Sequence, residues 1–215
     1  TVVAATAVAA AGADAVGVLV SSLAVVGGAG DVSINGFSPA GTGILFENGA
    51  GVSTTTGAIG LYGTGADFGL DIADGALDTD SGDITLEGTA TAATAIAGVR
   101  VTGDGLTTNG GDIRVTGTSA GGVGVQLGDG GAFTIGSGGG AITIEGTGID
   151  AGVLMQGNQV ASGGGAVSIT GDGEDFGVVL DGSDVDSGAG DITIRGDAVF
   201  GISAIGVSAD DTNLL

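Results

Sequence analysis

Residues 98–117 read GVRVTGDGLTTNGGDIRVTG, and this stretch contains every element of a repeat that runs through the chain. Gly98–Val101 alternates after a leading glycine, Leu106 marks a shorter apolar segment, and a glycine-rich turn leads into Ile113–Gly117. Period-two alternation rich in valine and isoleucine is typical of β-strands, and glycine clusters mark turns. One unit is therefore predicted to contain two alternating strands and one short strand, each followed by a turn.

The closing pattern, aliphatic-x-aliphatic-x-Gly, occurs seven times along the chain. Successive copies begin 27, 25, 29, 29, 25 and 25 residues apart, and every aliphatic position is Val, Ile or Leu. The copies are Val32–Gly36, Ile59–Gly63, Ile84–Gly88, Ile113–Gly117, Ile142–Gly146, Val167–Gly171 and Ile192–Gly196. A unit of this length cannot bury its apolar face alone, so neighbouring units must stack.

We therefore predict an all-β fold, a parallel β-helix (β-solenoid) of about 25–29 residues per coil with seven to eight coils. It is expected to be right-handed, as crossover connections between parallel strands usually are. Residues 1–215 form one domain, with a weaker first coil in 1–31, clear repeats in 32–208, and an end or continuation in 209–215. The inner aliphatic ladder is predicted to include Ile84, Leu86, Ile113, Val115, Ile142, Ile144, Val167, Ile169, Ile192 and Ile194.

The seven closing glycines are interpreted as turn glycines, because corners need positive φ and close backbone approach. They are Gly36, Gly63, Gly88, Gly117, Gly146, Gly171 and Gly196. The alternative all-β architecture is an antiparallel sandwich or barrel. That alternative gives no reason for a fixed closing glycine. It also does not explain why the extra residues of the longer units lie between strands, in Thr89–Ala97 and Asp197–Ile205.

Composition excludes several function classes. The chain of 215 residues has 50 Gly, no Cys and no His, and three Lys plus Arg stand against 25 Asp plus Glu, giving a net charge of −22. Such a chain cannot neutralise a phosphate backbone, so no nucleic-acid partner is expected, and a basic membrane-surface module is equally excluded. No segment has the uninterrupted apolar length of a membrane span, so membrane insertion is not expected. Mean hydropathy of +0.53 favours a folded aliphatic core over disorder.

The repeat GVxLxG…V…GGDITIxG, clearest in residues 98–196, resembles the β-strand repeats of large bacterial surface proteins. These include filamentous-haemagglutinin-like proteins and autotransporter passengers. The resemblance covers roughly residues 17–208 and implies a right-handed parallel β-helix displayed or released outside the cell. It therefore implies an extracellular or cell-surface location. The motifs are specific for architecture and say little about activity.

The outward positions of the closing strand (Ile113–Gly117 and its equivalents) place Arg114 diagonally between Glu87 and Glu145 on neighbouring coils. Ion pairs there are expected to fix the register and to contribute under about 1 kcal/mol each. The outward positions of the strand that begins with the leading glycine (Gly98–Val101 and its equivalents) read Leu19, Leu45, Asp71, Arg100, Gln126, Leu154, Val179 and Ser208. Leu154 and Val179 are expected to form a small exposed apolar patch, which is one possible lateral protein contact.

Two acidic clusters have the residue types that Ca²⁺ prefers, several carboxylates in a flexible loop. The predicted metal ligands are Asp78, Asp80, Asp83, Asp181, Asp184 and Asp186. In addition, the residue directly before the closing strand is an aspartate in four units: Asp31, Asp83, Asp112 and Asp191. Asp83 and Asp112 belong to consecutive coils, so they should stack about 5 Å apart. The alternative is a solvated acidic surface that keeps the rod soluble. No cofactor is expected to be required, and Ca²⁺ is the one that these clusters could bind.

The sequence therefore predicts an extracellular structural protein, a rigid rod or a self-assembling filament subunit that associates end to end or laterally. The alternative is an adhesin that binds a carbohydrate or host surface, with Ca²⁺ as a bridge. Its contact loops would be the inserted corners Thr89–Ala97 and Asp197–Ile205. A polysaccharide-active enzyme comes third, because 25 acids always supply carboxylate pairs while Trp, His and Lys are lacking. The chain is predicted not to be an enzyme.

Overall fold

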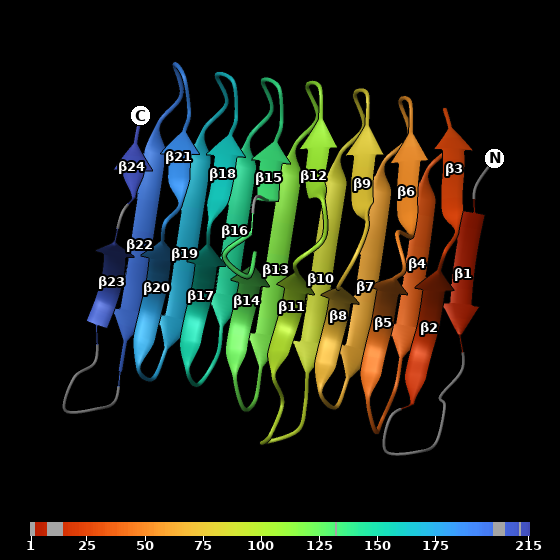
Figure 1. Cartoon of the computed structure of the whole chain (residues 1–215), viewed down its shortest axis with the longest axis horizontal. Coiled ribbons are helices and arrows are strands. Elements are labelled where there is room, and N and C mark those ends of the chain that lie inside the picture. The colour runs from red at the N-terminus through yellow and green to blue at the C-terminus, as the bar shows by residue number, and fades with distance from the viewer. Residues whose placement is uncertain (1–2, 8–14, 132, 200–204, 211) are drawn as a thin grey trace.

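The predicted β-solenoid is confirmed. The computed structural model describes residues 3–7, 15–131, 133–199, 205–210 and 212–215. These residues form three parallel sheets of eight strands each, and each coil gives one strand to each sheet (Figure 1). No described segment is a helix that could cross a bilayer.

The three sheets are called A, B and C in the order in which each coil visits them. Sheet A contains β1 (Val3–Ala7), β4 (Val32–Phe37), β7 (Ile59–Gly65), β10 (Ile84–Ala90), β13 (Ile113–Ser119), β16 (Ile142–Thr147), β19 (Val167–Gly173) and β22 (Ile192–Ala198). Sheet B contains β2 (Val16–Ser21), β5 (Thr42–Glu47), β8 (Phe68–Ile72), β11 (Ala97–Val101), β14 (Val123–Leu127), β17 (Ala151–Gln156), β20 (Phe176–Asp181) and β23 (Ile205–Asp210). Sheet C contains β3 (Ala24–Gly28), β6 (Gly51–Thr54), β9 (Ala76–Thr79), β12 (Gly105–Thr108), β15 (Phe133–Gly136), β18 (Asn158–Ala161), β21 (Asp184–Asp186) and β24 (Asn213–Leu214).

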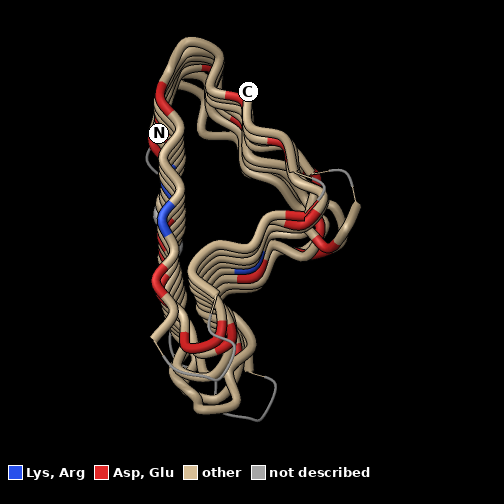
Figure 2. Tube along the Cα trace, turned by 90° about the vertical axis from the view of Figure 1, so that its left-hand side faces the viewer, with Lys and Arg blue, Asp and Glu red and all other residues tan. Residues whose placement is uncertain are grey.

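Seen along the rod axis, the coil is a three-sided loop in which sheet A is the long straight side (Figure 2). The chain descends sheet A and returns upward through sheets B and C (Figure 1). From the C-terminal end this path runs counter-clockwise toward the viewer, so the solenoid is right-handed. Register is kept from coil to coil in sheet A: Ile84 pairs with Ile59 on one side and with Ile113 on the other.

Aliphatic side chains fill the space that the three sheets enclose. The predicted ladder is buried from Ile84 to Ile169, with exposed fractions of 1% or less. Ile192 and Ile194 are only partly buried, because β22 has a neighbouring strand on one side alone. Sheet B adds two inward positions per coil, such as Val153 and Met155. Burial of this continuous apolar column is the main stabilising contribution to the rod.

The interpretation of the seven closing glycines as turn residues is wrong. Gly36, Gly63, Gly88, Gly117, Gly146, Gly171 and Gly196 lie inside the strands of sheet A, and none of them has a positive φ. Their role is the close approach of two backbones. A Cβ at Gly146 would lie 1.9 Å from the carbonyl oxygen of Gly152 in sheet B, and one at Gly117 would lie 2.1 Å from that of Gly124.

Positive φ does occur at the corner between sheets C and A, in the glycine-rich turns. Gly138, Gly163 and Gly188 occupy equivalent places in three successive coils, with φ of 62°, 70° and 64°. A left-handed backbone conformation of this kind favours glycine. The predicted glycine-rich turns are therefore confirmed at this corner.

A column of buried hydroxyl groups at the same corner was not predicted. In four coils a Ser or Thr donates a hydrogen bond to the carbonyl of the glycine three residues later, as Ser187 does to Gly190 at 2.6 Å. These four are Thr54, Ser137, Ser162 and Ser187. Thr79 and Thr108 occupy the equivalent places, but each donates to the glycine carbonyl one coil earlier and accepts from the N–H of the glycine three residues later. Ser137 and Ser162 also donate to the carbonyl of the equivalent serine one coil later, both at 3.2 Å. The sequence signal is Ser/Thr-x-x-Gly before each closing strand.

The glycine contact between sheets A and B predicts an asymmetric response to alanine. Gly146→Ala would force Cβ into the backbone of Gly152, so we expect it to lower the free energy of unfolding by about 3 kcal/mol, the upper end of the usual cost of overpacking. Gly136→Ala is the matched control, because Gly136 is also in a strand, has no positive φ, and a Cβ there meets nothing closer than 4.0 Å. Urea unfolding followed by circular dichroism measures both, and equal losses would contradict the proposed role of Gly146.

Candidate functional site

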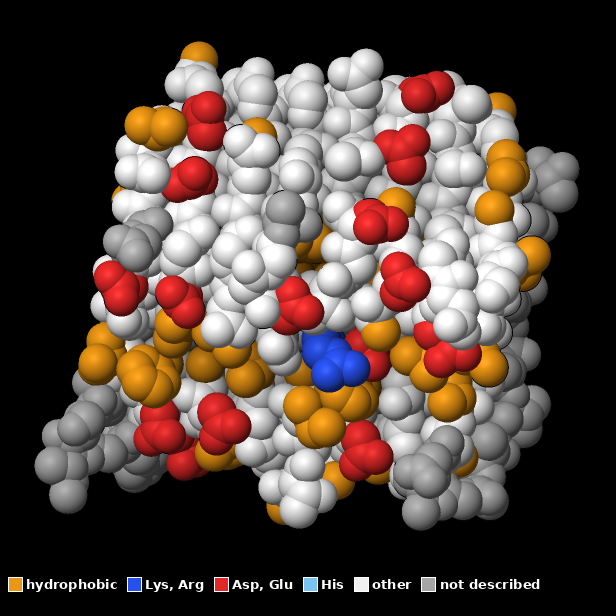
Figure 3. Space-filling model, viewed as in Figure 1, with side chains coloured by type: hydrophobic (Ala, Val, Ile, Leu, Met, Phe, Trp, Pro, Cys, Tyr) orange, Lys and Arg blue, Asp and Glu red, His pale blue; other side chains and the backbone are white. Residues whose placement is uncertain are grey.

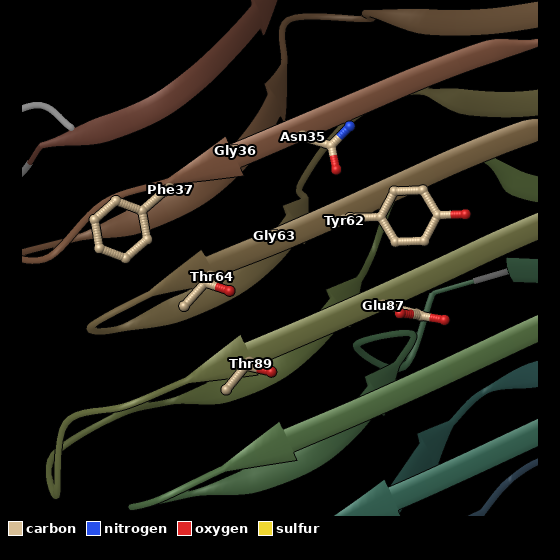
Figure 4. A pocket seen from close by; sticks show the side chains of 8 residues that line it. All are labelled: Asn35, Gly36, Phe37, Tyr62, Gly63, Thr64, Glu87 and Thr89. Carbon is tan, nitrogen blue, oxygen red and sulfur yellow. The ribbon is translucent and has the colours of Figure 1, made fainter. Parts of the chain in front are cut away.

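The outer face of sheet A carries two parallel rows of side chains that border a shallow hollow. The side chains of both rows come from three neighbouring strands, β4, β7 and β10. Asn35, Tyr62 and Glu87 are aligned in one row by the sheet register. The second row is Phe37, Thr64 and Thr89, two residues further along each strand, and Figure 4 shows the two rows on either side of Gly36 and Gly63. The hollow has a volume of about 300 Å³.

Tyr62 and Phe37 give this hollow an aromatic character. Tyr62 is 37% exposed and Phe37 is 48% exposed. The Tyr62 ring lies along its own strand above Gly60, since a Cβ at Gly60 would be 2.9 Å from its Cε2 and 3.0 Å from its hydroxyl oxygen. Gly60 therefore lets the ring lie flat on the sheet with its other face toward solvent.

The chemistry that this hollow offers is recognition. An aromatic face beside amide, carboxylate and hydroxyl groups can stack on an apolar patch of a ligand and hydrogen-bond its polar atoms. Asn35 donates to the Ser33 hydroxyl at 3.4 Å, so the amide is held weakly and keeps its oxygen free for a donor. The sequence did not indicate this site, because only the register shows which side chains are the neighbours of Tyr62.

The six predicted calcium ligands are not brought together. The described residues contain no group of three or more acidic side chains placed to hold a metal ion. Their carboxylates instead accept hydrogen bonds within and between coils. Asp78 accepts from the Thr107 hydroxyl and Asp184 from the Asn213 amide, while Asp186 accepts from the Gly188 N–H at 2.7 Å. Asp83 accepts from a backbone N–H, Asp181 accepts from the Gln156 amide at 3.5 Å, and Asp80 is exposed. This geometry gives the calcium hypothesis no support.

Three of the aspartates that directly precede a strand of sheet A have a clear structural role. The Oδ1 atoms of Asp31, Asp83 and Asp112 accept hydrogen bonds from the backbone N–H of the equivalent residue one coil later, each at 2.8 Å. Asp83 and Asp112 thus stack as predicted, and the side chain continues the hydrogen-bond ladder around the corner. Satisfying an otherwise unpaired N–H is a sufficient reason for an acid there.

The predicted ion pair between Arg114 and Glu145 is confirmed. Among the described residues Arg114 makes no ion pair with Glu87. A second pair, which the sequence analysis missed, joins Arg100 to Asp71 through two hydrogen bonds of 2.8 and 2.6 Å. Arg100 and Asp71 had been placed correctly in one outward column, but the column alone did not show that their side chains meet.

The two inserted corners differ in how much of them is described. In Thr89–Ala97 the first residues extend β10 to Ala90, and the loop proper presents Ile96, which is 50% exposed. Ile96 lines a hollow on the outer side of sheet B together with Phe68 and Leu45. In Asp197–Ile205, Asp197 accepts a hydrogen bond from Arg195 at 2.7 Å, and residues 200–204 lie outside the described residues.

Comparisons with protein-family models, with curated proteins and with solved structures found no match to this chain.

The corner aspartates predict a difference between two substitutions of Asp112. Asp112→Ala removes the acceptor of the Ala141 N–H, and we expect it to lower the free energy of unfolding by about 1 kcal/mol. Asp112→Asn keeps an acceptor oxygen and removes the repulsion from the stacked Asp83, so it should be neutral or slightly stabilising. Thermal unfolding of the two variants tests the role. Equal destabilisation by both would show that the charge itself is needed, as a bound cation would require.

Proposed function

We propose that this protein is an extracellular structural rod that extends by end-to-end stacking of copies. The observation that carries the proposal is the coil-to-coil repeat, because each coil offers the next one the same backbone ladder and the same inward aliphatic positions. A following coil buries these positions: Val178 and Val185 are 0% exposed beneath Val207 in β23 and Leu214 in β24, which are themselves 44% and 56% exposed. An identical coil from a second copy would bury Val207 and Leu214 in the same way.

The backbone of this coil offers the matching hydrogen bonds. In earlier coils the N–H at the first position of sheet A points toward the C-terminal side, as Ile84 does when it donates to the Asp112 carbonyl at 2.9 Å. The equivalent groups of Ile192 and Ile194 therefore face the open edge of β22. Open strand edges with this geometry favour pairing with another chain. A second copy in register continues both the ladder and the apolar interior.

Charge sets the conditions for stacking. A net charge of −22 makes two rods repel each other, and this repulsion is screened by salt. End-to-end association is therefore expected to increase with ionic strength. The scarcity of Lys and Arg leaves few sites for trypsin-like proteases, and all three arginines are held in ion pairs. This supports a rod that works outside the cell.

Electron microscopy and light scattering over a range of protein and salt concentrations test the proposal. We expect filaments or end-to-end oligomers that grow with both concentrations. Ile194→Lys places a charge at the open end of the interior and should abolish them. Thr193→Lys adds the same charge on the outward face of the same strand and should not. Rods that stay single at every concentration, or an equal effect of the two variants, would refute end-to-end stacking.

A second candidate function, carbohydrate binding, is favoured by the hollow around Tyr62. The solvent face of its ring, beside Asn35 and Glu87, could stack on a sugar ring. Labelled rods on a glycan array test this: Tyr62→Ala should lose any signal, and Thr143→Ala, two coils from Glu87 on the same face, should keep it. A chelator that removes the signal without changing the circular dichroism would add Ca²⁺ to the site. Binding that survives Tyr62→Ala would reject this site.

A further inference from the structure

The outer face of sheet B carries two hollows that follow one another along the rod axis, and together they are called the groove. Its central column is the predicted one, confirmed by the strand register: Leu19, Leu45, Asp71, Arg100, Gln126, Leu154, Val179 and Ser208. Figure 3 shows a band of apolar side chains across this face, interrupted by one arginine and bordered above and below by acidic side chains. The arginine divides the groove into an N-terminal and a C-terminal half.

The C-terminal half is a hollow of about 470 Å³. Its apolar lining is Val123, Ala151, Leu154, Phe176 and Val179. Asp150 and Asp175 stand on one rim, each directly before the first residue of its strand, and Asp181 ends β20 on the other side. The hollow is therefore apolar at its floor and negative at both edges.

In the N-terminal half, an arginine of the chain itself lies on an aromatic ring beside a carboxylate. There the guanidinium of Arg100 lies 4.2 Å above the centre of the Phe68 ring and bonds both oxygens of Asp71, which is 4% exposed. An arginine over an aromatic face and beside a carboxylate is a favourable arrangement. The rod thus supplies its own cation to this half of the groove.

The C-terminal half has the aromatic ring without the cation, and the position of Asp71 is taken there by Val179, so the nearest acid beside the ring is Asp175. Phe176 occupies the same column of sheet B as Phe68. Arg100 comes from the coil after Phe68, and the equivalent residue in the coil after Phe176 is Ser208. The residue before each ring is an aspartate, Asp67 or Asp175. An arginine from outside could therefore take the place over Phe176 that Arg100 takes over Phe68.

We propose that the C-terminal half of this groove binds a polypeptide segment in which apolar side chains alternate with arginine. The apolar side chains would cover Leu154 and Val179, and the arginines would reach Phe176 and the acidic rims. Charge decides the occupant: a second copy carries −22 and has its three arginines engaged, so it is repelled here. The groove is lateral and the stacking edges are axial, so this inference does not depend on the proposed function.

Methyl NMR of the folded rod, titrated with synthetic peptides, tests the proposal. The probe is an eight-residue peptide of alternating leucine and arginine, compared with serine–arginine and leucine–glutamate peptides of equal length. We expect saturable shifts of the Leu154 and Val179 methyl signals with the first peptide only. Shifts spread over all faces, equal binding of the serine–arginine peptide, or shifts produced by raising the rod concentration alone would overturn the proposal.

Matched variants locate the site. Leu154→Ser should weaken binding of the leucine–arginine peptide roughly tenfold, as the loss of one buried leucine implies. Leu19→Ser changes the same residue type in the same column outside the C-terminal half, and should change affinity less than about twofold. The pair Asp150→Asn and Asp175→Asn should weaken binding more than Asp80→Asn and Glu87→Gln, which change the net charge equally. Equal effects within either comparison would show attraction by the overall charge alone.

Discussion

The contact between two backbones, at the glycines of sheets A and B, is the constraint on which the rest of the structure depends. The closing glycine of each unit lies against the leading glycine of the next strand, and that leading glycine lies against the closing glycine of the following coil, so a side chain at either place would enter a neighbouring backbone. The two sheets therefore touch along one line and separate beyond it. The wedge between them, closed by sheet C, holds the aliphatic interior (Figure 2). In sheets A and B extra residues are accommodated at the corners, because a residue added inside a strand would move a glycine off this line; the one register shift among the described strand pairs is in sheet C, between Val26 and Gly28.

The architecture could be predicted from the sequence because several independent features of the repeat indicate the same fold. Spacing, alternation and the preference for valine and isoleucine each indicate stacked parallel strands, and the columns read from the sequence agree with the register of sheets A and B. The function of Gly146 and its equivalents could not be predicted correctly. A glycine at the end of an alternating segment is compatible with a turn and with a crowded strand, and only the position of sheet B distinguishes the two.

Side-chain pairing was predictable where geometry leaves one choice. Arg114 had two acidic neighbours at equal register distance, and the structure selects Glu145. Other pairings depend on how much space the surrounding backbone leaves for a side chain, which the sequence does not show. Examples are the ion pair of Arg100 with Asp71 and the hydrogen bond of the buried Ser162 hydroxyl. The candidate hollow at Tyr62 was missed for the same reason, since its lining comes from three coils whose mutual positions the sequence specifies only through the register. The residue types suggested calcium at the acidic loops, yet most of their carboxylates accept hydrogen bonds from side chains or backbone N–H groups of the same or the next coil.

The acidic charge is distributed so that stacking remains possible. In the outward column of sheet A, Glu87 and Glu145 are separated by Thr116, which places the carboxylates two coils apart, about 10 Å. That distance is close to the screening length of physiological salt. Asp172 and Asp197 do stack, and Arg195 bonds the second of them at 2.7 Å. Asp83 and Asp112 also stack, and each accepts a hydrogen bond from a backbone N–H instead.

Axial and lateral contacts use different groups of the same coil, and this separation limits how they can influence each other. The open edge of β22 offers backbone groups and inward side chains, whereas the groove on sheet B offers outward side chains only. Stacking a further coil extends the groove without covering it, because the partner strand lies beside the column and not above it. A rod that grows along its axis therefore keeps its lateral surface available, and each added copy repeats that surface at a fixed spacing.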